Sequence, residues 1–116
     1  MNRSETRRDV AMRLLELGAG IRTKGFRLCI YCVEHMLFDA FGASEALSKS
    51  ARDLGMGIKS AYKYVLTNAL SAGKRIGRRF TPGEFLCFLA EYAAERAIKS
   101  DWKQNFNDYY VVGKIF

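Results

Sequence analysis

The chain has 116 residues, of which 49% are hydrophobic, so it can bury one core and hardly two. Its 19 Lys and Arg outnumber 12 Asp and Glu, and the resulting formal charge of +7 favours a polyanionic partner. No stretch has the apolar length of a membrane span, and the N-terminus leads into no apolar signal core. We therefore expect a cytoplasmic protein with no membrane partner.

Apolar residues at helical spacing run through the first half of the chain. They predict a first helix over residues 6–17, ended by Gly18, and a second that begins at the N-cap residue Thr23 and is stopped by Gly42. Ser44 is expected to cap a third helix. The apolar stripes consist of Val10, Leu14 and Leu17 in the first helix and of Phe26, Ile30, Val33, Leu37 and Phe41 in the second.

Residues 51–62 have the layout of a helix-turn-helix. Ala51 is small enough for the second helix of the motif to cross close to the first, Leu47 and Leu54 form an apolar stripe, and Gly55 suits a left-handed C-terminal cap. In the fourth helix, which follows the turn, the residues expected to pack inward are Ile58, Tyr62, Val65, Leu66 and Ala69. Those expected to face outward are Ser60, Lys63, Tyr64, Thr67, Asn68 and Ser71.

Positive charge is concentrated in this fourth helix and the loop after it. Residues 55–83 contain six cations and no Asp or Glu, a pattern that draws phosphates and strengthens DNA binding through counterion release. Ser, Thr, Asn and Lys can also contact base edges. We therefore expect double-stranded DNA to be bound in its major groove by Lys59, Ser60, Lys63, Tyr64, Thr67, Asn68, Lys74, Arg75, Arg78 and Arg79. A solvated basic face without a partner is the alternative, because helical hairpins with Gly in the turn also occur in proteins that bind no DNA.

A strong start signal for another helix follows the expected loop at residues 73–80. In Thr81-Pro82-Gly83-Glu84, Thr is at N-cap, Pro at N1 and Glu at N3, which makes a capping box. The buried face of that helix is expected to hold Phe85, Phe88, Leu89 and Tyr92.

The C-terminal end is rich in aromatic residues. We divide the chain into a helical DNA-binding domain at residues 1–98 and a tail at residues 99–116 that packs on the domain or on a partner. Residues 109–116 look extended or β-like. An unpaired strand invites pairing with a second copy, so we expect a homodimer; folding back onto its own core is the alternative.

Four segments together resemble the C-terminal DNA-binding effector domain of the stage-zero sporulation protein A family, the sporulation initiation transcription factors. They are Leu14-Leu15-Glu16-Leu17-Gly18, Lys24-Gly25-Phe26, Ser50-Ala51-Arg52-Asp53-Leu54 and Phe80-Thr81-Pro82-Gly83-Glu84-Phe85, and the resemblance covers residues 10–97. It implies an all-helical transcription factor domain that inserts a recognition helix into the major groove.

Two departures limit what the resemblance implies. Full-length family members carry a receiver domain ahead of the effector domain, and this chain starts almost at the first effector helix, so phosphorylation control is not expected in these residues. The family presents Arg, Glu and His on the recognition helix, whereas the matching positions here are Ala61, Lys63, Tyr64, Thr67 and Asn68. The groove-binding role is therefore carried over, and the family's target sequence is not.

The remaining residue clusters favour no catalytic chemistry. Cys29, Cys32 and His35 recur at three-residue steps and could form a metal site with Cys87, but their apolar neighbours favour buried thiols. We expect no metal, cofactor, small-molecule substrate or enzymatic activity, because the chain has no phosphate loop or nucleophile elbow. The predicted fold is all-α, a five- to six-helix bundle with a helix-turn-helix. The predicted function is transcription regulation; a protein-interaction module with a drifted recognition face is the alternative.

Overall fold

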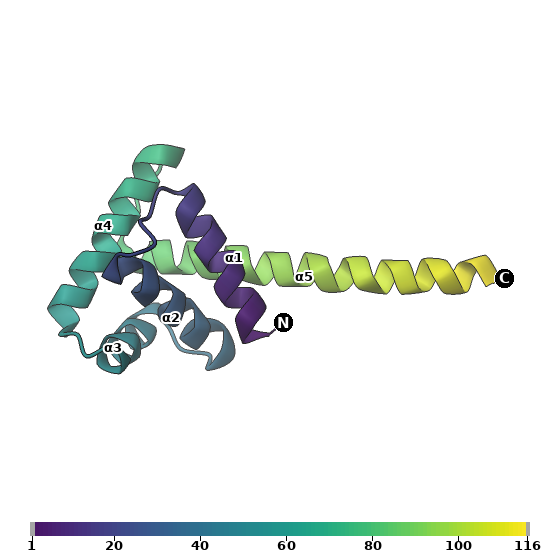
Figure 1. Ribbon diagram of the computed structural model, residues 1–116, viewed down its shortest axis with the longest axis horizontal. Coiled ribbons are helices and arrows are strands. Elements are labelled where there is room, and N and C mark those ends of the chain that lie inside the picture. Colours follow the sequence, from purple (N-terminus) through teal and green to yellow (C-terminus); the bar gives the residue numbers. More distant parts are fainter. Residues whose placement is uncertain (1, 116) are drawn as a thin grey trace.

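The computed structural model describes residues 2–115, with side chains for residues 2–100. Over this range the chain is all-helical, without strands. Its five helices are α1 (Arg3–Glu16), α2 (Lys24–Phe38), α3 (Ala43–Asp53), α4 (Ile58–Ile76) and α5 (Pro82–Ile115). The first four helices gather around the start of α5, and the rest of α5 runs on past them to the C-terminus (Figure 1). None of the described helices has the length and apolar composition needed to cross a membrane.

Helix ends that depend on local chemistry agree with the sequence. Thr23 Oγ1 accepts a hydrogen bond from the Phe26 N–H at the start of α2. The capping box of α5 is closed on both sides, because the Thr81 N–H donates to Glu84 Oε1 at 3.0 Å and the Glu84 N–H donates to Thr81 Oγ1 at 3.1 Å. Gly55 adopts the left-handed conformation, with φ of 68°, directly after α3.

The connection between α2 and α3 differs from the prediction. Helix α2 ends at Phe38, before Gly42, and Ala40 takes a positive φ of 56° in the connection. Gly42 serves as the N-cap of α3 without a side-chain hydrogen bond, so the expected cap at Ser44 is wrong. Ser is favoured over Gly as an N-cap residue, but α3 already begins at Ala43, so Ser44 lies inside the first turn of the helix.

The core is centred on α2, which contacts each of the other four helices. In α1 the predicted stripe of Val10, Leu14 and Leu17 is buried. The stripe predicted for α2 also faces the core: Phe26 and Val33 are buried, and Ile30, Leu37 and Phe41 are partly buried and pack against it, although Phe41 lies after the end of α2. Because neighbours surround α2, its buried residues extend beyond one stripe and include Leu28, Cys29 and Cys32.

The C-terminal segment is helical, so the prediction of an extended or β-like segment at residues 109–116 is wrong through residue 115. Helix α5 also continues through the expected division between residues 98 and 99. Aromatic and β-branched residues favour strands only when a neighbouring strand is present, and none lies in the described range. The tail's side chains lie outside the described residues, so its packing and the homodimer remain predictions.

The turn between α4 and α5 is shorter than predicted. Helix α4 includes Gly73 and ends at Ile76, and Gly77 takes the left-handed C-terminal cap with φ of 71°. A Cβ on Gly73 would lie 2.2 Å from the carbonyl oxygen of Arg78. Gly73 therefore marks a close approach of the turn to the helix rather than the start of a loop.

Candidate nucleic-acid interface

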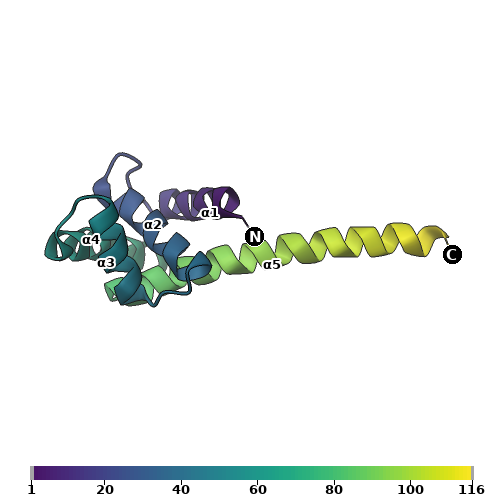
Figure 2. The same ribbon diagram turned by 90° about the horizontal axis from the view of Figure 1, so that it is seen from below.

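Helices α3 and α4 are joined by a tight turn over residues 54–57. The Gly55 N–H donates to the Arg52 carbonyl at 3.1 Å, and the Met56 N–H donates to the Ala51 carbonyl at 2.8 Å. These bonds satisfy the last carbonyls of α3. Ala51 is only 2% exposed, as expected for a small residue where two helices approach closely. Both helices lie at the end of the molecule opposite the C-terminus (Figure 2).

The inner face of α4 consists mainly of alanines. Its buried residues are Ala61, Val65, Ala69, Ala72 and Gly73. Val65 and Ala69 were predicted to be buried, but Ile58 and Tyr62 are 50% and 49% exposed, so their predicted inward packing is wrong. The small side chains of this face allow α4 to lie close to the neighbouring helices. Ala61 therefore points into the core, and Tyr62 beside it points outward.

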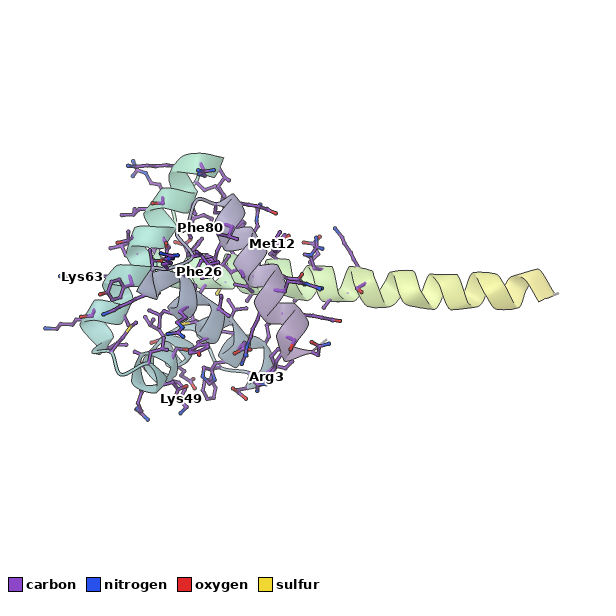
Figure 3. All side chains as sticks on the ribbon, in the orientation of Figure 1. Arg3, Met12, Phe26, Lys49, Lys63 and Phe80 are labelled. Carbon is purple, nitrogen blue, oxygen red and sulfur yellow. The ribbon has the colours of Figure 1, made fainter. Side chains whose placement is uncertain are left out.

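The outer face of α4 is polar and positively charged. Lys59, Ser60, Lys63 and Thr67 are exposed, and Figure 3 shows Lys63 extending away from the rest of the protein. The Thr67 hydroxyl donates to the Lys63 carbonyl at 3.0 Å, which leaves its oxygen able to accept a hydrogen bond from outside. Within residues 2–100, no ion pair involves Lys59, Lys63, Lys74 or Arg79.

Tyr64 and Asn68 do not face outward freely, contrary to the prediction. Both are partly buried where the start of α2 crosses α4. A Cβ on Gly25 would lie 2.4 Å from Asn68 Nδ2 and 3.0 Å from the Tyr64 carbonyl oxygen. Lys24 places its ammonium 6.0 Å from the centre of the Tyr64 ring. The close crossing at Gly25 therefore packs the Asn68 side chain and the Tyr64 backbone against α2, and Lys24 lies over the Tyr64 ring.

Two of the predicted DNA-binding arginines contact other parts of the protein. Arg75 Nη1 donates to the Glu16 carbonyl at 3.3 Å, where a cation complements the C-terminal end of the α1 dipole. Arg78 lies over the rings of Phe80 and Phe88, at 4.7 Å and 5.5 Å from their centres. Both remain exposed to solvent, so each can also contact a phosphate.

A second group of cations lies at the start of α2 and was missing from the sequence prediction. Arg22, Lys24 and Arg27 are exposed at the start of α2, which reaches α4 at Gly25. Three cations within six residues were visible in the sequence. Only the crossing of α2 and α4 brings Lys24 beside the basic helix, where its ammonium lies over the Tyr64 ring.

The cysteine and histidine cluster is divided in the structure. Cys29 and Cys32 are buried and Cys87 is exposed. Burial raises the pKa of the Cys29 thiol and raises that of Cys32 to about 11. Among the described residues, no three His, Cys, Asp or Glu side chains gather as metal ligands.

His35 instead bridges two helix ends. Its Nδ1 lies 2.7 Å from Asp39 and its Nε2 lies 3.2 Å from Asp53, so the ring links the end of α2 to the end of α3. The hydrogen bond from His35 lowers the pKa of Asp39, and Arg3 adds to this effect. Hydrogen bonds from Lys49 and, to a smaller extent, from His35 lower the pKa of Asp53.

Comparison of the chain with protein-family models, curated proteins and solved structures found no match. The similarity to the sporulation regulators therefore remains a prediction that depends on the four segments quoted from the sequence.

Proposed function

We propose that this protein is a non-enzymatic transcriptional regulator that binds a specific sequence of double-stranded DNA. The observation that carries the proposal is the outer face of α4, where exposed lysines and hydroxyl side chains occur without an acidic neighbour between residues 54 and 83. A helix with this face fits the major groove in width and charge. DNA is therefore the partner that the site suits best.

In this proposal α3 and α4 form a helix-turn-helix and α4 is the recognition helix. The tight turn at residues 54–57, the buried Ala51 and the left-handed Gly55 support this assignment. The N-terminal turns of a recognition helix contact base edges, so Lys59, Ser60 and Lys63 are the first candidates for reading bases. Thr67 follows one turn later.

Other residues hold the backbone of the DNA. Lys74 and Arg79 are exposed and form no ion pair in the described range, so they are suited to phosphates on one side of α4. Arg22 and Arg27 offer the same chemistry at the start of α2. Tyr64 and Asn68 contribute only the edges that α2 leaves uncovered.

The resemblance to the stage-zero sporulation protein A effector domain supports the same function. The residues that carry it include the α2 start at Lys24-Gly25-Phe26 and the capping box of α5, and both have structural roles here. We include membership of that family in the proposal. The target sequence is a separate question because the outward residues of α4 differ from the family's.

Selection from random duplexes followed by fluorescence anisotropy tests the proposal. With four phosphate contacts, the slope of log affinity against log salt should be about −4. Lys63→Ala should relax base preference at one position and weaken the selected site by about 1 to 3 kcal/mol, whereas Arg79→Ala should weaken all sequences alike. Arg8→Ala is the matched control, because it removes one exposed positive charge from α1, outside both the α4 face and the tail, and should change neither quantity. Absence of duplex binding at low salt would refute the proposal.

A protein-interaction module is the second candidate. Three large apolar residues of α4, Ile58, Tyr62 and Leu70, are at least 49% exposed, and exposed apolar groups also occur in protein interfaces. Under this alternative the lysines contribute no salt-dependent DNA binding. The anisotropy experiment therefore separates the two functions.

The proposal includes a homodimer formed through residues 99–116. Helix α5 carries these residues away from the other helices, which leaves the tail accessible to a second copy (Figure 1). Two copies would present two recognition helices to neighbouring half-sites. Light scattering over a concentration series should give a dimer mass for the whole chain and a monomer mass after removal of residues 108–116. A whole chain that stays monomeric refutes the dimer.

A further inference from the structure

An exposed apolar surface lies at the start of α4. It is formed by Ile58, Lys59, Tyr62 and Lys63, which together we call the α4 pad. Ile58 and Tyr62 are four residues apart and therefore share one face of the helix, and the two lysines repeat that spacing beside them. The methylene stems of the lysines extend the apolar surface, while their ammonium groups remain in solvent.

The shape of the α4 pad favours an occupant with a groove of its own. All four residues come from one helix, so the pad lies on a ridge and not between two elements. Proteins that receive a partner helix commonly do so in an apolar groove. A single-helix ridge is instead the shape that enters the major groove, and the first turns of the helix are those that approach the bases.

The charges around the α4 pad specify the occupant further. Lys59 and Lys63 form no ion pair within residues 2–100, and no acidic residue occurs between residues 54 and 83. The complementary surface is apolar at its centre and negatively charged at its sides. In duplex DNA, the C5-methyl group of thymine is the apolar group of the major groove, and phosphates border that groove. Cytosine presents an amino group there, which an apolar surface would leave without a hydrogen bond.

We propose that the α4 pad recognises thymine methyl groups in the major groove through Ile58 and Tyr62, while the positive charge of Lys59 and Lys63 draws the pad into the groove. This inference depends on the proposed DNA-binding function and adds the chemical group that is read. It assigns a base-reading role to the two apolar residues that packing within the protein does not require.

Replacement of each thymine in the selected duplex by deoxyuridine tests the inference with the whole chain. The replacement removes the methyl group and keeps the hydrogen-bonding edge of the base. At one or two positions the dissociation constant should rise about fourfold, the factor expected for one methyl group buried against an apolar surface. In Ile58→Ala or Tyr62→Ala, the difference between thymine and deoxyuridine should disappear at the contacted position. Leu70→Ala is the matched control, because Leu70 is an exposed apolar residue of α4 outside the pad, and it should retain the fourfold difference.

The outcomes separate this inference from the proposed function. Tight, sequence-specific binding with equal affinity for thymine and deoxyuridine at every position overturns methyl recognition and leaves DNA binding intact. Failure to bind any duplex at low salt overturns both. Light scattering identifies a second copy of the chain as the occupant, and overturns methyl recognition, if Ile58→Ala converts a dimer to a monomer.

Discussion

Replacement of Gly73 by Ala should destabilise the protein, although alanine is the better helix former and Gly73 lies inside α4. The new Cβ would lie 2.2 Å from the carbonyl oxygen of Arg78. That oxygen belongs to the backbone of the turn and cannot rotate away, so the turn must move. We take about 3 kcal/mol for this overpacking and subtract about 1 kcal/mol for the gain in helix propensity. The expected net loss is about 2 kcal/mol.

Gly83→Ala is the matched control, because it makes the same substitution in the first turn of α5. Its Cβ would lie 3.9 Å from that of Ala43, an ordinary contact. The protein should gain about 0.5 kcal/mol, since alanine restricts the unfolded chain and fits the helix. Urea unfolding followed by circular dichroism measures both variants. Gly73→Ala should also lower Tm by about 10 °C. The reasoning is refuted if Gly73→Ala unfolds at the same or higher urea concentration than the parent with an unchanged m-value.

Three further predictions concern buried and paired side chains. A thiol reagent at neutral pH should label Cys87 rapidly and the two buried thiols of α2 at least about 100-fold more slowly, because burial raises their pKa and blocks access; three equally fast thiols would contradict this. Arg7→Ala should lower the free energy of unfolding, measured in urea at pH 7, by about 2 kcal/mol, because it leaves the buried Glu34 carboxylate unpaired. The loss is smaller than for a fully buried pair because Arg7 itself is 54% exposed. Asp39→Asn should reduce the loss of stability below about pH 4. The hydrogen bond from His35 lowers the pKa of Asp39 in the folded state, so the stabilisation from ionised Asp39 is complete above the unfolded pKa and is lost as pH falls. If the stability difference between pH 3 and pH 6 is the same in both proteins, the pair is not coupled to folding.

The features predicted correctly are those that depend on a few neighbouring residues. The capping box at Thr81 and Glu84 and the N-cap at Thr23 need only local chemistry, and the structure contains all of their hydrogen bonds. Gly55 likewise has the left-handed backbone that its position after α3 implies. Such signals give the start or end of a helix without knowledge of the fold.

The predictions that failed depend on residues distant in sequence. Tyr62 was assigned to the core because it recurs at helical spacing with Ile58 and Val65, but in the structure the buried face of α4 is turned toward Ala61, and Tyr62 is 49% exposed. The contact of Arg75 with the Glu16 carbonyl was missed rather than wrongly predicted, because it joins residues 59 positions apart. The tail was predicted from strand propensity, which carries little weight when the capped helix α5 continues into it.

The outer face of α4 is the part of the fold that packing explains least. Its inner face contacts the core through Ala61, Val65, Ala69, Ala72 and the partly buried Tyr64, so stability does not require Ile58 or Tyr62 on the other side. Single apolar residues on a surface are common, but these two are neighbours and lie beside lysines that form no ion pair in the described range. An apolar surface attracts an uncharged group and the lysines attract anions. A partner with an apolar group and anionic groups within the length of one helix turn would account for the composition of this face. The major groove of duplex DNA presents thymine methyl groups and is bordered by phosphates.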